Sequence, residues 1–189
     1  MFAELYPWIK LVHVVSALVF FGLGGAYTLH KAAVDRAADF DTLRIALARF
    51  QELLVSYRLA GLTIFLSGMT LVLTAWGWRT AWVDLALGLF LFNLVIGSFI
   101  DEPWGKAMKK LVGEGDGPLT PRARALVADQ RMNFSHTIKT GVDFALVFLM
   151  TVKPGLGLAV GGAALIITTY TLWATRRKAA RPAPRSSLA

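Results

Sequence analysis

The sequence predicts an all-α integral membrane protein, a polytopic helical bundle with five transmembrane helices, four forming a core and one added to it. Of its 189 residues, 56% are hydrophobic and 17% are charged, whereas soluble domains carry about 25% charged residues. Long apolar runs recur along the chain, and lysine and arginine gather in every second segment between them. The lack of cysteine excludes a disulfide scaffold and a cysteine-based zinc module.

Each predicted span is an apolar run near the ~20 residues that cross ~30 Å of hydrocarbon. The first three cover residues 8–29, 53–76 and 82–100. The next run, from Thr140 to Trp173, is too long for one helix. Lys153-Pro154-Gly155 divides it, because proline lacks the amide donor that a helix interior requires. The fourth and fifth spans are therefore expected at 133–152 and 156–174, within a single domain of residues 1–175.

The basic residues predict the orientation. The two long connections, 30–52 and 101–132, and the tail 176–189 carry four, six and five of the 20 lysines and arginines, and five spans place all three on one side. Basic loops favour the cytoplasmic side, so we expect the N-terminus outside and the C-terminus inside, in a bacterial inner membrane. The positive charge is then expected to face membrane lipids rather than nucleic acid, and the tail is expected to be disordered.

The two long connections carry local signals. Leu43, Leu47 and Phe50 have helical spacing, which extends the second helix into water. The second connection contains a glycine-rich stretch, residues 113–118, that indicates a flexible turn. Trp104 is expected at the inner membrane interface, where tryptophan is enriched.

The second span carries a polar face with helical spacing. Its members are Ser56, Thr63, Ser67, Thr70 and Thr74. Such a face lines a cleft or pore, or it lets neighbouring helices approach closely; both interpretations stay open.

The fourth span contains an intramembrane polar cluster. His136, Thr140 and Asp143 share one face, and Lys139 lies one turn before the aspartate. A carboxylate inside a membrane is costly unless it is paired or protonated, so Asp143 is either a proton-handling or counter-charge group or half of a structural pair with Lys139. Asn93, midway along the third span, is a possible hydrogen-bond partner for this cluster.

His13, in the first span, is the candidate cofactor ligand. Met69 and Met150 are expected near its depth in the membrane, and imidazole with thioether suits haem iron or cuprous copper. Core packing is the alternative for all three residues. In the fifth span, Gly157 and Gly161 form a small-xxx-small pattern that permits a homo-oligomer.

These residues carry a resemblance to known families. The run Trp8-Ile-Lys-Leu-Val-His13 resembles the opening "W-x-K-x-x-H" helix of HemJ-type protoporphyrinogen oxidases, and Leu149-Met-Thr-Val-Lys153-Pro154 looks like the end of that family's fourth helix. The short chain with a histidine in its first span also resembles CopD-like copper-resistance membrane domains and a related group of uncharacterised membrane proteins. The HemJ-type lysine early in the third helix is replaced by Ala86.

The resemblance implies a haem-binding redox or haem-pathway membrane protein, with His13 contacting haem b or a porphyrin and Met150 or Met69 as second ligand. A copper-handling or small-solute membrane protein is the alternative, and a non-catalytic membrane component is a further one. No residue is assigned a catalytic role, and whether the protein is an enzyme is left open.

Overall fold

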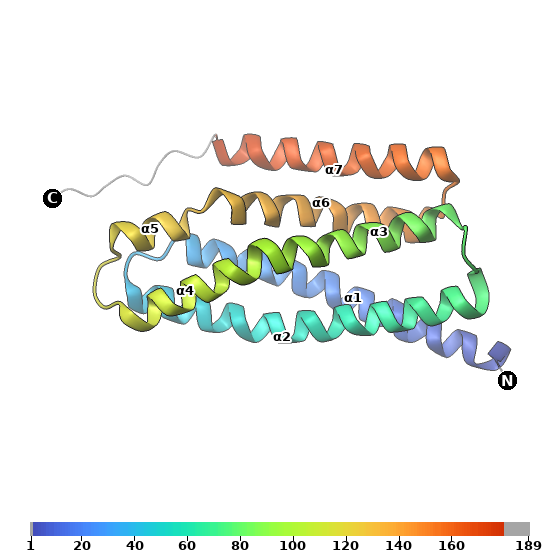
Figure 1. Ribbon diagram of the computed structural model, residues 1–189, viewed down its shortest axis with the longest axis horizontal. Coiled ribbons are helices and arrows are strands. Elements are labelled where there is room, and N and C mark those ends of the chain that lie inside the picture. Colours follow the sequence, from blue (N-terminus) through green and yellow to red (C-terminus); the bar gives the residue numbers. More distant parts are fainter. Residues whose placement is uncertain (1, 180–189) are drawn as a thin grey trace. The chain divides into compact units, whose positions relative to one another are not determined.

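A computed structural model describes residues 2–179, and the described chain is almost entirely helical, with no strand (Figure 1). The elements are α1 (Phe2–Asp35), α2 (Phe40–Leu71), the π-helical turn η1 (Val72–Trp76), α3 (Ala81–Ile96), the π-helical turn η2 (Gly97–Asp101), α4 (Glu102–Glu114), α5 (Pro121–Val127), α6 (Gln130–Val152) and α7 (Leu156–Ala179). The predicted all-α fold class is therefore confirmed.

Within the described range, four helices are long and apolar enough to cross a membrane: Glu4–Asp35, Phe40–Trp76, Ala81–Glu114 and Leu156–Arg177. The fifth long helix, α6, has 23 residues and a more polar sequence. The helices extend well beyond the predicted spans, because polar turns continue them past the apolar runs. The chain is thus a polytopic helical membrane protein. Four of its helices are long and apolar enough to cross a membrane, and α6 is a fifth long helix with a more polar sequence.

The elements group into two compact units. The first contains α1, α2, η1, α4 and α5, and the second contains α3, α6 and α7. The sequence alone gives no sign of this division and predicts one domain.

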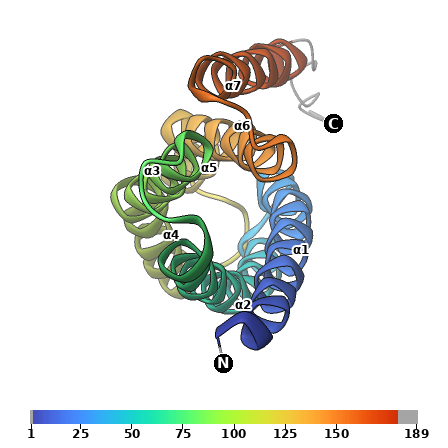
Figure 2. The same cartoon turned by 90° about the vertical axis from the view of Figure 1, so that its right-hand side faces the viewer.

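In the first unit, α1 and α2 lie side by side as an antiparallel pair (Figures 1 and 2). Aromatic rings fill the space between them: the centroids of Phe20 and Tyr57 are 4.1 Å apart, and those of Tyr27 and Phe50 are 4.4 Å apart. Phe50, Leu43 and Leu47 are buried, which confirms that the first connection continues the second helix.

A capping box starts α2. The backbone N–H of Thr42 donates to Asp39 Oδ1 at 2.8 Å, and the Thr42 hydroxyl lies 3.4 Å from the Asp39 backbone N–H. These contacts satisfy amide donors that a helix start otherwise leaves unpaired. Asp39 therefore fixes where α2 begins.

Trp104 of α4 is buried, whereas the sequence predicts it at the lipid interface. It is 4% exposed, its Nε1–H donates to Leu126 O at 2.9 Å, and its ring centroid lies 6.1 Å from that of Phe50. The Lys31 ammonium lies 5.6 Å from the same ring and 2.5 Å from Asp35 Oδ1. The residue faces inward because α4 is amphipathic, with Met108 and Val112 buried on the same side.

The glycine-rich stretch after α4 is bonded to the start of α2. Gly117, with φ of 66°, accepts from the Phe40 N–H at 2.9 Å, and Gly115 O accepts from the Arg44 guanidinium at 3.1 Å. A Cβ at Gly115 would lie too close to Phe40 Cε1 for any side chain. The predicted flexible turn is therefore held at several points.

In the second unit, the break at Lys153-Pro154-Gly155 is found as predicted. Helix α6 ends at Val152, Lys153 has a φ of 50°, and α7 begins at Leu156. The Lys153 ammonium lies 5.6 Å from the centroid of Trp82 in α3. Helix α7 continues to Ala179, so residues 176–179 are helical where the sequence predicts the tail; residues 180–189 lie outside the described part.

Candidate functional site

His13 lies between α1 and α2 in the first unit and reaches across to α2. Its Nδ1 is 3.2 Å from Ile64 O and 3.1 Å from Ser67 Oγ. The Ser67 hydroxyl itself lies 2.5 Å from Thr63 O, to which it donates. One imidazole nitrogen is thus held by the backbone and a side chain of the neighbouring helix.

These contacts determine which nitrogen carries the proton. A carbonyl oxygen only accepts hydrogen bonds, so the contact with Ile64 requires a proton on Nδ1. Ser67 Oγ accepts from the same N–H, because its own proton is directed to Thr63 O. In the neutral ring Nε2 then has the free lone pair, which is the form in which histidine binds a metal.

Gly68 provides the room for this ring. A Cβ built at residue 68 would lie 3.0 Å from His13 Cε1 and 3.3 Å from Nδ1, closer than a Cβ normally approaches. Glycine therefore lets the imidazole lie directly against the backbone of α2. The sequence does not single out Gly68, because one glycine in an apolar helix carries no distinct signal.

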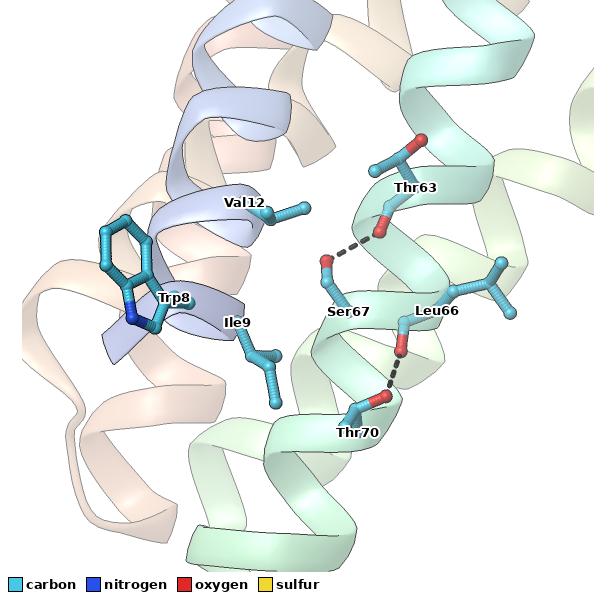
Figure 3. Close-up of a pocket in the computed structure, with 7 residues that line it drawn as sticks. All are labelled: Trp8, Ile9, Val12, Thr63, Leu66, Ser67 and Thr70. Carbon is cyan, nitrogen blue, oxygen red and sulfur yellow. Dashed lines mark hydrogen bonds between the residues drawn. The ribbon is translucent and has the colours of Figure 1, made fainter. Parts of the chain in front are cut away.

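The predicted polar face of α2 is only partly assembled around a groove. A groove of about 380 Å³ is lined by Thr63, Ser67, Thr70 and Leu66 of α2 and by Trp8, Ile9 and Val12 of α1 (Figure 3). Ser56 and Thr74 do not line it. The hydroxyls of Thr63, Thr70 and Thr74 donate to carbonyls one turn earlier, at 2.9, 2.8 and 2.7 Å.

The two predicted methionine ligands occupy different units. Met69 follows Gly68 on α2 and is half-buried, whereas Met150 lies on α6 and is 40% exposed. Within residues 2–179, no group of three or more His, Asp or Glu side chains is arranged to hold a metal ion. Their role as ligands stays a prediction.

The second unit brings together Asn93 of α3 and Asp143 of α6. Asn93 Nδ2 donates to Asp143 Oδ1 at 3.0 Å. Asn93 is 8% exposed, and its Oδ1 is buried without a hydrogen-bond partner among the described residues. The contact gives the Asp143 carboxylate a hydrogen-bond donor from a neighbouring helix.

The other predicted members of the cluster precede Asp143 on α6. Thr140 is bonded within α6, donating to His136 O at 2.9 Å, and Lys139 lies one turn before Asp143.

His30, at the far end of α1 from His13, is bonded to its own helix, with Nδ1 2.8 Å from Ala26 O. His13 therefore differs from His30 in being held by a neighbouring helix.

The apolar helices and the polar side chains within them define a helical integral membrane protein. The family described as "Predicted integral membrane protein (DUF2269)" matches residues 7–154, so the chain belongs to the DUF2269 family. The matched segment runs from α1 to the end of α6 and leaves α7 outside. Searches of curated proteins and of solved structures each find no match.

Proposed function

We propose that this protein binds haem b in a bacterial inner membrane through His13 and serves in electron transfer or the haem pathway. The observation that carries the proposal is the contact of His13 Nδ1 with Ile64 O at 3.2 Å. An imidazole whose Nδ1 proton is held by a backbone carbonyl presents Nε2 as a ligand, and haem proteins use such a histidine as the proximal ligand.

Two further features support an oriented ligand. Ser67 Oγ restricts rotation of the ring from the same side as Ile64. Gly68 lets the ring lie directly against α2, in the space that a Cβ would need. Haem bound to Nε2 would supply a one-electron couple, and the chain's own residues would set the direction and basicity of the ligand.

Copper is the alternative occupant of the same residue. A soft ligand pair of His13 and Met69, both in the first unit, suits cuprous ion. Metal analysis of the purified protein distinguishes copper from haem, because the copper alternative predicts stoichiometric copper that is lost in Met69→Leu. The haem proposal predicts pigment instead.

The test of haem binding is an absorption spectrum of protein purified from haem-replete cells. Wild-type protein is expected to show a Soret band that His13→Ala abolishes. His30→Ala is the matched control, because His30 lies in the same helix and its Nδ1 is bonded to Ala26 O of that helix. Colourless wild-type protein, or equal loss in both variants, would overturn the proposal.

A second candidate function rests on the buried pair in the second unit. Asn93 donates to Asp143 through Nδ2 and leaves its Oδ1 without a described partner. An amide can serve both forms of a carboxyl group, donating to the ionised form and accepting from the protonated form. We therefore propose proton-coupled movement of a small solute as the alternative, tested by uptake into vesicles with Asp143→Asn.

The orientation is part of the proposal. We infer an external N-terminus and a cytoplasmic C-terminus from the basic residues of the two long connections. Because the chain has no cysteine, single substitutions give a clean labelling test. In right-side-out vesicles, an impermeant thiol reagent is expected to label Lys153→Cys and spare Gly113→Cys; the reverse pattern would invert the orientation.

A further inference from the structure

The net positive charge of the chain is concentrated beyond α6. The two long connections, 30–52 and 101–132, carry ten lysines and arginines, but nine aspartates and glutamates make them nearly neutral. Residues 155–189 carry no acidic residue. Their five basic residues are Arg176, Arg177, Lys178, Arg181 and Arg185. This segment therefore supplies five of the eight net positive charges, at and beyond the C-terminal end of α7.

Helix α7 has the length that brings this basic segment to a membrane surface. The candidate span Leu156–Arg177 has 22 residues, which rise by about 32 Å at ~1.5 Å per residue. That rise is close to the ~30 Å of hydrocarbon in a bilayer. With Leu156 at one surface, Arg177 reaches the headgroups at the opposite surface.

The side chain of Arg177 is oriented by a row of aromatic rings. Its guanidinium lies over the ring of Trp173, with Cζ 4.2 Å from the ring centroid. The Trp173 ring is 5.7 Å from that of Tyr170, which in turn is 5.4 Å from that of Phe144 in α6. The row connects the last turns of α7 to α6 and presents the guanidinium at the end of the span.

Trp173 and Arg177 have the chemistry of a lipid headgroup site. Trp173 is 48% exposed, and Arg176 and Arg177 are exposed. Tryptophan is enriched at the membrane–water interface. A guanidinium stacks on an aromatic face while the N–H groups of its planar fork match a phosphate bidentately. Basic residues that directly follow a membrane helix also attract anionic lipids.

We propose that the C-terminal end of α7 binds the phosphate of an anionic phospholipid, with Arg177 on Trp173 as the headgroup ligand. The neighbouring basic residues add a positive field, which favours a lipid of net negative charge over phosphatidylcholine, whose choline group is positive. The site lies outside residues 7–154, which the family matches. It uses neither His13 nor Asp143, so it is independent of both proposed functions.

The test is native mass spectrometry of the full chain in an uncharged detergent, titrated with dioleoyl phosphatidylglycerol and separately with dioleoyl phosphatidylcholine. The apparent Kd of the first bound lipid is expected to be at least about tenfold lower for phosphatidylglycerol, because each basic residue near an anionic surface contributes about fivefold in affinity. Equal affinities for the two lipids would overturn the proposal.

Charge variants locate the site. Arg177→Gln removes the headgroup ligand and should weaken phosphatidylglycerol binding about fivefold. Arg177→Lys keeps the charge without the planar fork and should weaken it less. Lys106→Gln is the matched control, because it removes one charge from a side chain that is 76% exposed in a nearly neutral connection. A Lys106→Gln effect as large as that of Arg177→Gln, or no effect of Arg177→Gln, would contradict the assignment.

Trp173→Leu tests whether the ring orients the ligand. The variant keeps all five basic residues, so a positive field alone predicts unchanged binding. The proposed site predicts that phosphatidylglycerol binding weakens about 2- to 5-fold, the contribution of an exposed cation–π contact, while phosphatidylcholine binding stays the same. Unchanged phosphatidylglycerol binding would contradict a headgroup site built on Trp173 and Arg177.

A nucleic acid is the competing partner for a basic segment. A short DNA duplex, titrated against the full chain in phosphatidylcholine nanodiscs, is expected to bind weakly, with Arg177→Gln changing its affinity no more than Lys106→Gln. Duplex binding that is tighter than phosphatidylglycerol binding and is lost in Arg177→Gln would overturn the proposal.

Discussion

The imidazole of His13 occupies the space that a side chain at residue 68 would need, with Cε1 3.0 Å from the position of a Cβ on Gly68. This close approach lets Nδ1 reach Ile64 O and Ser67 Oγ. The candidate ligand and the helix that orients it therefore depend on a residue with no side chain.

Gly68→Ala is expected to push the His13 ring away from α2 and to destabilise the protein by about 1–3 kcal/mol, the usual cost of overpacking. Unfolding in mixed micelles measures the change. Gly22→Ala is the matched control, because a Cβ at Gly22 meets nothing within 4 Å and alanine favours a helix. Equal stability of Gly68→Ala and Gly22→Ala would contradict the close approach.

Trp104 is expected to be an anchor for α4. Trp104→Ala removes a side chain that is 4% exposed and should cost about 3–5 kcal/mol. Trp104→Phe keeps a ring but loses the hydrogen bond to Leu126 O, so its cost should be smaller, about 1–2 kcal/mol. The same unfolding assay compares them with Trp78→Ala, at a side chain that is 53% exposed; an equal cost at Trp78 would argue against burial of Trp104.

Asn93 and Asp143 are expected to be energetically coupled. Asn93→Leu removes the donor to the carboxylate and should cost about 1–3 kcal/mol. A double-mutant cycle with Asp143→Leu should give a coupling of about 0.5–3 kcal/mol. Thr151→Val, at an exposed hydroxyl of α6 that donates to Val147 O, is expected to change stability by less than about 0.5 kcal/mol. Strict additivity of the Asn93 and Asp143 changes would show that the contact contributes nothing.

The start of α2 is expected to loosen in acid. The Thr42 backbone N–H holds the pKa of the Asp39 carboxyl below its usual value, so the cap stabilises the helix above the unfolded pKa of about 3.9. That contribution is lost as the pH falls through the lower folded pKa. The protection factor of the Thr42 amide, which refers its exchange rate to the intrinsic rate at each pH, should therefore fall at low pH in the wild type. Asp39→Asn, which keeps an acceptor without titrating, should flatten that response. A wild-type protection factor that does not fall at low pH would contradict a stabilising role of the ionised Asp39 cap.

Hydropathy was sufficient to predict the long helices α1, α2, α3, α6 and α7, because only a helix satisfies its own backbone groups across a long apolar run in lipid. Pro154 predicted the break after Val152. The helices α4 and α5 were not predicted. Hydropathy also located the continuation of α2 through Leu43, Leu47 and Phe50. It could not place Trp104, since burial of an aromatic ring depends on which face of α4 meets α1 and α2. The sequence counts Lys31 among the basic residues of the first connection, and it could not show that this side chain is buried, at 3% exposure.

The candidate site was less accessible from the sequence. Sequence patterns singled out His13 and the hydroxyl face. Ile64 and Gly68, which contact His13, are ordinary residues of an apolar helix, and their role is visible only when α1 lies against α2. Asn93 was predicted as a possible partner for the cluster, but which atom it meets, Asp143 Oδ1, depends on how α3 and α6 pack. Residue types alone do not tell a ligand from a packing residue here. The distances between helices are needed to distinguish the two.

The burial of Lys31 beneath Trp104 has a practical consequence for chemical footprinting. Lys31 is 3% exposed, whereas the Lys106 side chain on α4 is 76% exposed. An amine-acylating reagent should consequently mark Lys106 at once and reach Lys31 only after α4 detaches. The ratio of the Lys31 adduct to the Lys106 adduct in a mass spectrum would therefore report how often α4 detaches, without any introduced probe.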